Sequence, residues 1–247
     1  LIYIKKPKKI NILELGPGNS LMIKQIINSL KKIKTFDAKY TVYLHEKSEN
    51  WGLGFGTEGK PPTGNASAEE LKKYNAYFIG DTTQNTIYLT FDCGYENGNT
   101  EPILDALKKH DVKATFFVVG NFLETSPEIV KRMIAEGHTV GNHTYHHVEI
   151  TRVPDETAQE EILMTNEVIT GITGEEVSYM RPPFGVWQKN LERKLDVMTV
   201  LWTIDPLDWT TDNEDEIINK VVTQAGENDI ILLHDCYESS VNAALRI

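Results

Sequence analysis

The sequence has few cysteines and no long apolar run, and both shortages exclude classes of protein. Only Cys93 and Cys236 are cysteines among the 247 residues, which excludes a small scaffold held by several disulfides and leaves the redox compartment open. No apolar stretch approaches the roughly 20 residues that span a bilayer. No signal peptide is recognisable, but the chain begins at Leu1 rather than Met, so export remains open.

Positive charge is also scarce outside the first fifty residues. The formal net charge is -11, which argues against nucleic acid as an electrostatic partner. Residues 1–50 carry ten Lys and Arg against four Asp and Glu, whereas residues 51–247 carry 15 against 32. This change of sign predicts a domain boundary near residue 50.

Residues 1–50 have a strand–turn–helix–strand pattern of their own. The turn Glu14-Leu-Gly-Pro-Gly18, with Glu46 after the next strand, resembles the first motif of Rossmann-like methyltransferases, which bind S-adenosylmethionine. Fifty residues are too few for that fold. We therefore interpret the segment as an extra βαβ-like piece, a foreign fragment rather than a working methyltransferase.

From Thr86 onward, apolar strands alternate with amphipathic helices. Strands are predicted at 87–91, 114–119, 177–180, 198–204 and 230–233, with helices from Thr100, from Ser126-Pro127 and over about 155–170. Residues 51–85, rich in Gly and Pro, read as an irregular approach segment with a short helix around 67–74. Repeated βα units imply an α/β fold with a parallel sheet, and chemistry at the strand ends favours a barrel. The chain ends at Ile247 inside a predicted helix, so we expect the domain over 86–247 to be truncated at its C-terminus.

Four apolar runs each lead to residues able to carry out chemistry: Asp92, His143 with His147, Arg181, and His234. Imidazole is the commonest protein ligand for divalent transition metals, and two histidines separated by three residues reach one ion if the backbone turns helical after the first. Asp92 would stay ionised near a cation and serve as a base, and His234 would serve as an acid. The planar fork of Arg181 would hold a carboxylate by two bonds. The pattern predicts a metal-dependent hydrolase.

Each of these residues also has a purely structural interpretation. His146 or His147 could be a turn histidine, Asp92 a cap, and Arg181 a surface residue on a stiff turn. Asp205 and Asp208 could be solvated loop acids. His110 and His138, near helix ends, are better explained as partners of helix C-termini.

Five motifs along the chain together favour the catalytic interpretation. They are Thr90-Phe-Asp-Cys-Gly94, His143-Thr-Tyr-His-His147, Arg181-Pro-Pro-Phe-Gly185, Asp205-Pro-Leu-Asp-Trp209 and Ile231-Leu-Leu-His234. Their order resembles that of the polysaccharide deacetylases (carbohydrate esterase family 4, the NodB-homology domain). The resemblance covers about residues 86–247. It implies a distorted (β/α) barrel and metal-dependent removal of N- or O-acetyl groups from polysaccharides.

The resemblance also implies a role for each motif residue. Asp92 would be the general base, oriented by Arg181, and His234 the general acid, with Asp208 beside it. His143 and His147 would bind the metal, and the backbone N–H near Phe184 would help to stabilise the oxyanion. The residues expected to contact the substrate are Phe184, Trp209, Leu232 and Tyr95.

One motif position departs from the family pattern. The first motif usually has a second Asp that completes an Asp-His-His metal site, and here that position is Cys93. A thiolate binds zinc well and would favour zinc over harder metals. Alternatively, Cys93 is a spectator and the ion is held by two histidines and water. The sequence leaves both interpretations open.

The neighbourhood of Cys93 points to one branch of the family. The run Asp92-Cys-Gly-Tyr-Glu-Asn-Gly98, with Trp51-Gly52 and residues 71–76, resembles the delta-lactam-biosynthetic deacetylases of spore-forming bacteria. These enzymes remove the N-acetyl group from muramic acid in peptidoglycan. The resemblance implies a metal-dependent, exported or envelope-associated enzyme acting on peptidoglycan glycan strands, with neither nucleic acid nor an obligate protein partner. The ligand chemistry makes zinc the expected metal. The alternatives are a deacetylase of N-acetylglucosamine polymers such as chitin, and a catalytically dead carbohydrate-binding relative.

Overall fold

A computed structural model describes residues 49–50, 53–54, 63–64, 66–81, 83–187 and 196–247. Lys47–Ile247 form one compact unit. The turn Glu14–Gly18 and Glu46 lie outside the described residues. The methyltransferase-like interpretation, the boundaries at 50 and 85 and the C-terminal truncation therefore stay predictions.

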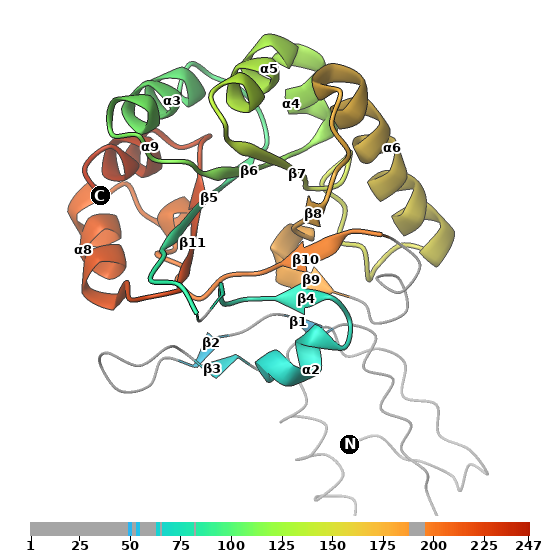
Figure 1. The fold of residues 1–247 in the computed structure, drawn as a ribbon, viewed down its shortest axis with the longest axis horizontal. Coiled ribbons are helices and arrows are strands. Elements are labelled where there is room, and N and C mark those ends of the chain that lie inside the picture. The colour runs from blue at the N-terminus through green and yellow to red at the C-terminus, as the bar shows by residue number, and fades with distance from the viewer. Residues whose placement is uncertain (1–48, 51–52, 55–62, 65, 82, 188–195) are drawn as a thin grey trace, which may run out of the picture. The chain divides into compact units, whose positions relative to one another are not determined.

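Seven parallel strands form a curled sheet at the centre of this unit (Figure 1). In spatial order they are β11 (Ile230–His234), β5 (Tyr88–Cys93), β6 (Thr115–Val118), β7 (Thr139–Asn142), β8 (Tyr179–Met180), β10 (Met198–Val200) and β4 (Ala76–Tyr77). The open edge of β11 is met by Ile204, which forms a parallel bridge with Ile231, and by an antiparallel bridge between Ile79 and Asp229. The predicted parallel, barrel-like α/β fold is confirmed.

The segment before β5 contributes to the sheet. Within it, β2 (Leu53–Gly54) pairs antiparallel with β3 (Thr63–Gly64), and β4 pairs in parallel with β10. β1 (Glu49–Asn50) pairs with β9 (Val186–Trp187). Two residues that the charge pattern assigned to the first segment thus pair with the barrel unit.

Helices surround the sheet on its outer side (Figure 1). They are α2 (Ala68–Lys72), α3 (Thr100–Lys109), α4 (Gly120–Thr125), α5 (Pro127–Ala135), α6 (Asp155–Thr173), α8 (Glu214–Gln224) and α9 (Glu238–Ala244), with short 3-10 turns η1 (Pro183–Gly185) and η2 (Asp208–Thr210). The expected start at Ser126-Pro127 is confirmed, because Ser126 is the N-cap of α5. The helix predicted over about 155–170 extends to Thr173 and ends at Gly174, whose φ of 76° is left-handed.

The buried side chains form cores on the two faces of the sheet. On the helix side, Phe91 and Phe116 stack with ring centroids 5.2 Å apart in the largest cluster, which also contains Cys93 and Leu233. Leu232 belongs to a second cluster with Trp202. Because side chains alternate along a strand, Asp92 and His234 project from the face opposite to Cys93 and Leu233. The strand pattern alone therefore directs Asp92 and His234 to the same side.

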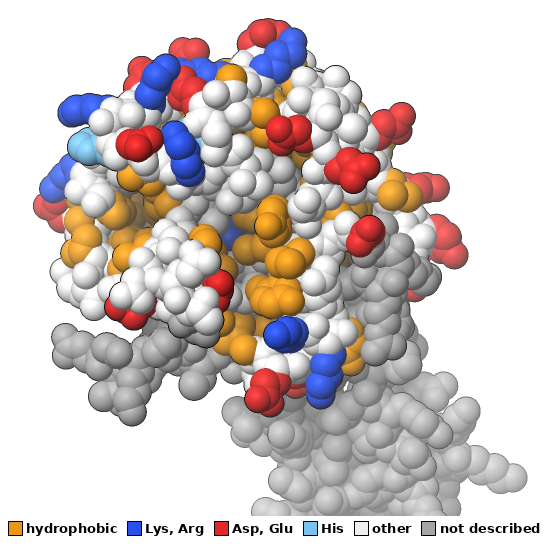
Figure 2. Space-filling view, in the orientation of Figure 1, with side chains coloured by type: hydrophobic (Ala, Val, Ile, Leu, Met, Phe, Trp, Pro, Cys, Tyr) orange, Lys and Arg blue, Asp and Glu red, His pale blue; other side chains and the backbone are white. Residues whose placement is uncertain are grey.

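Charge lies mainly on the outer helices. On the face seen in Figure 2, hydrophobic side chains gather over β8, β10 and β4, whereas acidic and basic side chains lie mostly over the surrounding helices. Among the described residues, no helix has the length and apolarity needed to cross a membrane.

Candidate active site

Asp92, at the end of β5, is held by a buried arginine. Arg181 Nη1 donates to Asp92 Oδ1 at 2.8 Å, and the two residues are 0% and 7% exposed. The other guanidinium nitrogens bind backbone: Nε donates to Val200 O and Nη2 to Leu201 O, both at 3.1 Å. The expected two-bond fork on the carboxylate is therefore wrong. Arg181 gives Asp92 one bond and uses the remaining donors to fix its own position.

The charges around Asp92 keep it ionised. Burial alone would raise the pKa of this carboxyl, but the charge of Arg181 above all, with smaller contributions from the histidines when they are protonated, outweighs burial, and the pKa falls below its ordinary value. An ionised carboxylate with one oxygen anchored is the state that a general base requires.

His143 follows β7 and has a defined tautomer. Its Nδ1 lies 2.7 Å from Arg181 O, and a carbonyl only accepts, so Nδ1 carries the proton and Nε2 a lone pair. Burial lowers the pKa of His143 to about 4, so the ring is neutral. Its Nε2 faces Asp92 Oδ2 at 3.5 Å. Two acceptors that face each other suit a cation between or beside them.

The second histidine completes the imidazole pair. The His147 ring lies 4.9 Å from that of His143, centroid to centroid, and burial lowers its pKa as well. Two neutral imidazoles with a carboxylate nearby fit a divalent transition metal.

The backbone between the histidines is not helical, which corrects the expected geometry. Thr144 and His147 have left-handed φ values of 62° and 55°. The imidazoles are brought together by these two reversals of the chain rather than by a turn of helix.

His234, at the end of β11, is paired with an acid, whereas Asp92 is paired with an arginine. Its Nδ1 donates to Asp208 Oδ1 and its backbone N to Asp208 Oδ2, both at 2.8 Å, and Ser240 also donates to Asp208. Burial alone would lower the pKa of His234. The hydrogen bond to Asp208 and the charges of Asp208, Asp92 and Asp205 outweigh burial, so the pKa is raised. His234 is therefore suited to hold a proton and donate it.

Base and acid stand side by side. β5 and β11 pair over five residues, and His234 is the register partner of Asp92. We call this end of the barrel, where Asp92, His143, Arg181 and His234 meet, the mouth.

The substrate candidates differ in exposure. Phe184, Trp209 and Tyr95 are 61%, 54% and 51% exposed, whereas Leu232 is only 3% exposed. Phe184, at a φ of 64°, places its ring edge-on to His147 at 5.0 Å. The three exposed rings are thus available to a ligand, while Leu232 lies in the second core cluster beneath the surface.

Two residues near the mouth were missed or undervalued by sequence reasoning. Asp205 accepts from Leu207 N at 2.9 Å, and burial raises its pKa, so it is not a solvated loop acid. The Tyr237 ring lies 6.2 Å from that of His234. Its position three residues after a predicted acid was the available signal.

Cys93 does not face the histidines. It is fully buried on the helix side, where its thiol lies 3.8 Å from Phe91 O. Burial and the charge of Asp235 raise its pKa well above the ordinary value, so the thiol stays protonated. Among the described residues, no group of three His, Cys, Asp or Glu side chains is placed to hold an ion.

Asp235 is the second buried acid near the end of β11. Burial raises its pKa to about 7. Thr100 Oγ1 lies 2.9 Å from Asp235 Oδ2 and also contacts Glu96 Oε2. The hydroxyl has one proton, so it can donate to only one of these two carboxyl groups at a time. Burial is what favours the protonated form of Asp235.

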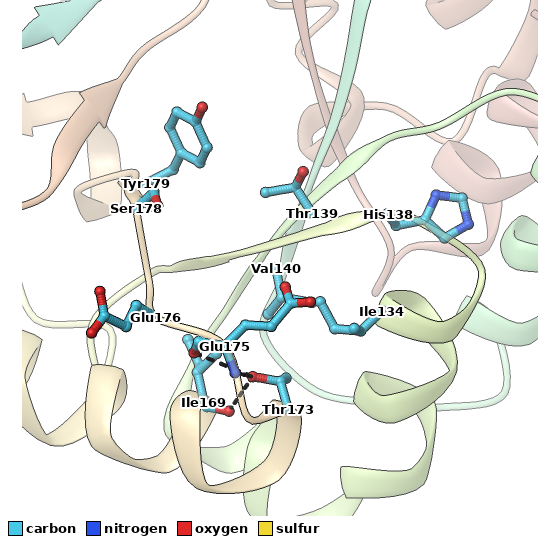
Figure 3. A pocket seen from close by; sticks show the side chains of 10 residues that line it. All are labelled: Ile134, His138, Thr139, Val140, Ile169, Thr173, Glu175, Glu176, Ser178 and Tyr179. Atoms are coloured by element: carbon cyan, nitrogen blue, oxygen red, sulfur yellow. Dashed lines mark hydrogen bonds between the residues drawn. The ribbon is translucent and has the colours of Figure 1, made fainter.

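A separate pocket lies at the other ends of β7 and β8 (Figure 3). Its walls come from the first residues of these strands and the end of α6, where Glu175 N and Thr173 Oγ1 hydrogen-bond at 3.1 Å. None of the residues predicted for catalysis lines it.

Comparison with known proteins agrees with this geometry. Residues 79–200 match the polysaccharide deacetylase family. The peptidoglycan-N-acetylmuramic acid deacetylase PdaA of Bacillus subtilis (strain 168) is 38% identical over 202 residues, 78% of this chain and 77% of that protein. The structure of PdaA, a family 4 carbohydrate esterase, superposes with a TM-score of 0.73 at 37% identity, covering 81% of this chain and 88% of that one.

Two further relatives are named for different sugars of peptidoglycan. The peptidoglycan-N-acetylmuramic acid deacetylase PdaC of B. subtilis (strain 168) is 40% identical over 66% of this chain and 35% of PdaC, and its structure gives a TM-score of 0.65 over 68% of this chain and 83% of that one. A peptidoglycan-N-acetylglucosamine deacetylase of Bacillus cereus is 36% identical over 66% of this chain and 61% of that protein. On this evidence, the chain belongs to the polysaccharide deacetylase family.

Proposed function

We propose that this protein is a peptidoglycan de-N-acetylase that acts on N-acetylmuramic acid. The observation that carries the proposal is the register pair Asp92 and His234, which lie side by side with opposite protonation preferences. Amide hydrolysis needs such a pair, since one group must accept a proton from water while the other delivers one to the leaving nitrogen.

Each side chain has a defined task in this scheme. Asp92, fixed by Arg181, accepts a proton from the attacking water. His234 keeps its proton through Asp208 and donates it to the departing amine. The backbone N–H of Phe184 donates to the oxygen that becomes negative on the acetamide carbon.

Deacetylases of this family generally depend on a divalent metal ion. We propose that His143 and His147 hold it, with water completing its coordination, and that it is zinc, since imidazole ligands suit zinc. When bound, such an ion polarises the acetyl carbonyl and makes water more acidic. Cys93 is left out of this ligand set because it is buried in the helix-side core and burial raises the pKa of its thiol well above the ordinary value.

The sugar specificity rests on the relatives. PdaA and PdaC are named for N-acetylmuramic acid, and PdaA matches over more than three quarters of both proteins. The B. cereus relative supports an N-acetylglucosamine polymer as the second candidate. Cell-wall glycan as substrate also supports an exported or envelope-associated protein.

Acetate release from two substrates tests the proposal. Glycan strands of peptidoglycan freed of their peptides would be compared with chitin oligomers, each with zinc and with a chelator. We expect faster release from the peptidoglycan strands and loss of activity in chelator. Preference for chitin would support the second candidate, and binding of glycan without acetate release would support the dead carbohydrate-binding relative.

A further inference from the structure

Glu161, in the middle of α6, is a buried acid that the catalytic scheme does not use. It is 7% exposed. Its Oε2 accepts from the backbone N of His146 at 2.8 Å, and its Oε1 accepts from His146 Nδ1 at 2.7 Å. The ring that it binds is largely exposed, with 65% of the side chain accessible. Both oxygens of a buried carboxylate thus accept hydrogen bonds from an exposed residue that directly precedes His147.

The loop 143–147, to which Glu161 is bonded through His146, has a strained backbone. Thr144 is β-branched and has a φ of 62°, and His147 has a φ of 55°. Non-glycine residues in this region are strained and persist only where the surroundings hold them. His146 lies between these two residues, so its attachment to α6 bears on the conformation at His147.

Three other hydrogen bonds hold the first part of the loop. Thr144 N donates to Asn142 Oδ1 at 2.7 Å, and Asn142 Nδ2 donates to Ile162 O on α6 at 2.8 Å. Gly120 N at the start of α4 donates to Tyr145 O at 2.9 Å. A Cβ at Gly120 would lie 2.6 Å from the Tyr145 ring, so this approach requires glycine. Against this background, Glu161 supplies the anchor nearest to His147.

We propose that Glu161 is a positioning residue that fixes the loop so that His143 and His147 converge on one ion. The inference rests on the proposed metal-binding role of the two histidines. Glu161 touches neither the ion nor the substrate. It acts by holding the backbone and ring of His146, and so sets the direction in which the chain enters His147.

Zinc affinity, measured by competition with a chromophoric chelator in the absence of substrate, tests this role. Partners that orient metal ligands typically contribute about 10–100-fold in affinity, and we expect a loss in this range for Glu161→Ala. Glu161→Gln should lose much less, because its amide oxygen still accepts from His146 N. His146→Ala should also lose little, because the backbone bond to Glu161 remains. Glu160→Ala, which removes an exposed acid from the same helix, is the matched control.

The possible results either support or contradict the positioning role of Glu161. Wild-type zinc affinity in Glu161→Ala would overturn the inference, as would an equal loss in Glu160→Ala. If Glu161→Ala does not fold, Glu161→Asp, whose shorter side chain draws the acceptor away from His146 N, should bind zinc more weakly than Glu161→Gln, and equal affinities would overturn the role. A wild-type protein that binds zinc in this Glu161-dependent way but releases no acetate would contradict the proposed function and leave the positioning role intact.

Discussion

The ends of β5 and β11 carry a buried aspartate on each face of the sheet, and the pKa values of the two aspartates are shifted in opposite directions. Inside the mouth, Asp92 lies against Arg181 and has a lowered pKa. On the helix side, Asp235 lies against the Thr100 hydroxyl, and burial raises its pKa to about 7. Burial disfavours the charge in both places, so the partner decides the protonation state. Arg181 keeps Asp92 ionised as a base, whereas no arginine contacts Asp235 among the described residues, and its pKa is raised instead.

The largest expected effect comes from removing the ionisable group inside the mouth. Asp92→Asn still accepts a hydrogen bond from Arg181 but cannot take a proton, and general-base contributions are about 10²–10⁴-fold. We expect acetate release to fall by that factor, while circular dichroism shows a folded protein. Normal turnover by this variant would remove Asp92 from the role of base.

The next effect concerns the acid. Asp208 raises the pKa of His234, so Asp208→Asn should lower it. His234 would then lose its proton at a lower pH, and the alkaline limb of kcat/KM against pH would move down the pH scale. At a pH above the pKa of His234 in both proteins, lowering that pKa by one reduces the protonated fraction about tenfold. Asp212→Asn, at an exposed site four residues away, should leave the limb in place, and an unmoved limb in Asp208→Asn would contradict the assignment.

Substitutions on the helix-side face of these strands, which carries Asp235 and Cys93 and is called the outer face below, should change stability rather than the rate of acetate release. The pKa of Asp235 is raised from 3.8 to about 7, so the folded state disfavours the ionised form. Stability is therefore lost as pH rises from about 4 to about 7 and is flat above that range. Asp235→Asn cannot ionise, so its Tm should fall less than that of the wild type between pH 5 and pH 8. Each kcal/mol corresponds to about 2–4 °C for a domain of this size, and parallel Tm curves would show that Asp235 is ionised throughout.

The smallest effect is expected at Cys93. If the thiol belongs to the outer face, Cys93→Ala should keep the zinc affinity of the wild type and lose about 1 kcal/mol of stability, as is typical of a buried truncation. A large drop in zinc affinity would place Cys93 among the metal ligands. Chelator competition and thermal unfolding on the same sample distinguish the two results.

The sequence predicted the mouth better than its surroundings. Parallel strands bring their carboxyl ends to one side of a sheet, so Asp92, Arg181 and His234 could be placed together from the strand pattern and motifs. The orientation of Cys93 could also have been predicted, because the alternation of side chains along a strand puts Cys93 on the face opposite to Asp92. The family motif favours the other expectation at this position, since it usually has a metal-binding Asp there.

Other features had no usable signal. Glu161 directly follows another acid, Glu160, and only the tertiary contact with His146 distinguishes the two. The left-handed conformation of Thr144 runs against the usual preference of a β-branched residue. Such features depend on how α6 and the loop meet, which local pattern does not encode.

The closure of the sheet has a mechanical consequence. On one side β11 is joined to β5 over five residue pairs, and on the other it meets the chain at Thr203 and Ile204. The pairing of β11 is therefore unequal, with a continuous seam between the two proton-transferring residues and a shorter one on the other side. Asp208 lies on the segment beyond the shorter seam and bonds to His234 and Ser240. It therefore joins the two sides at the mouth and keeps the carboxylate that sets the proton affinity of His234 in place.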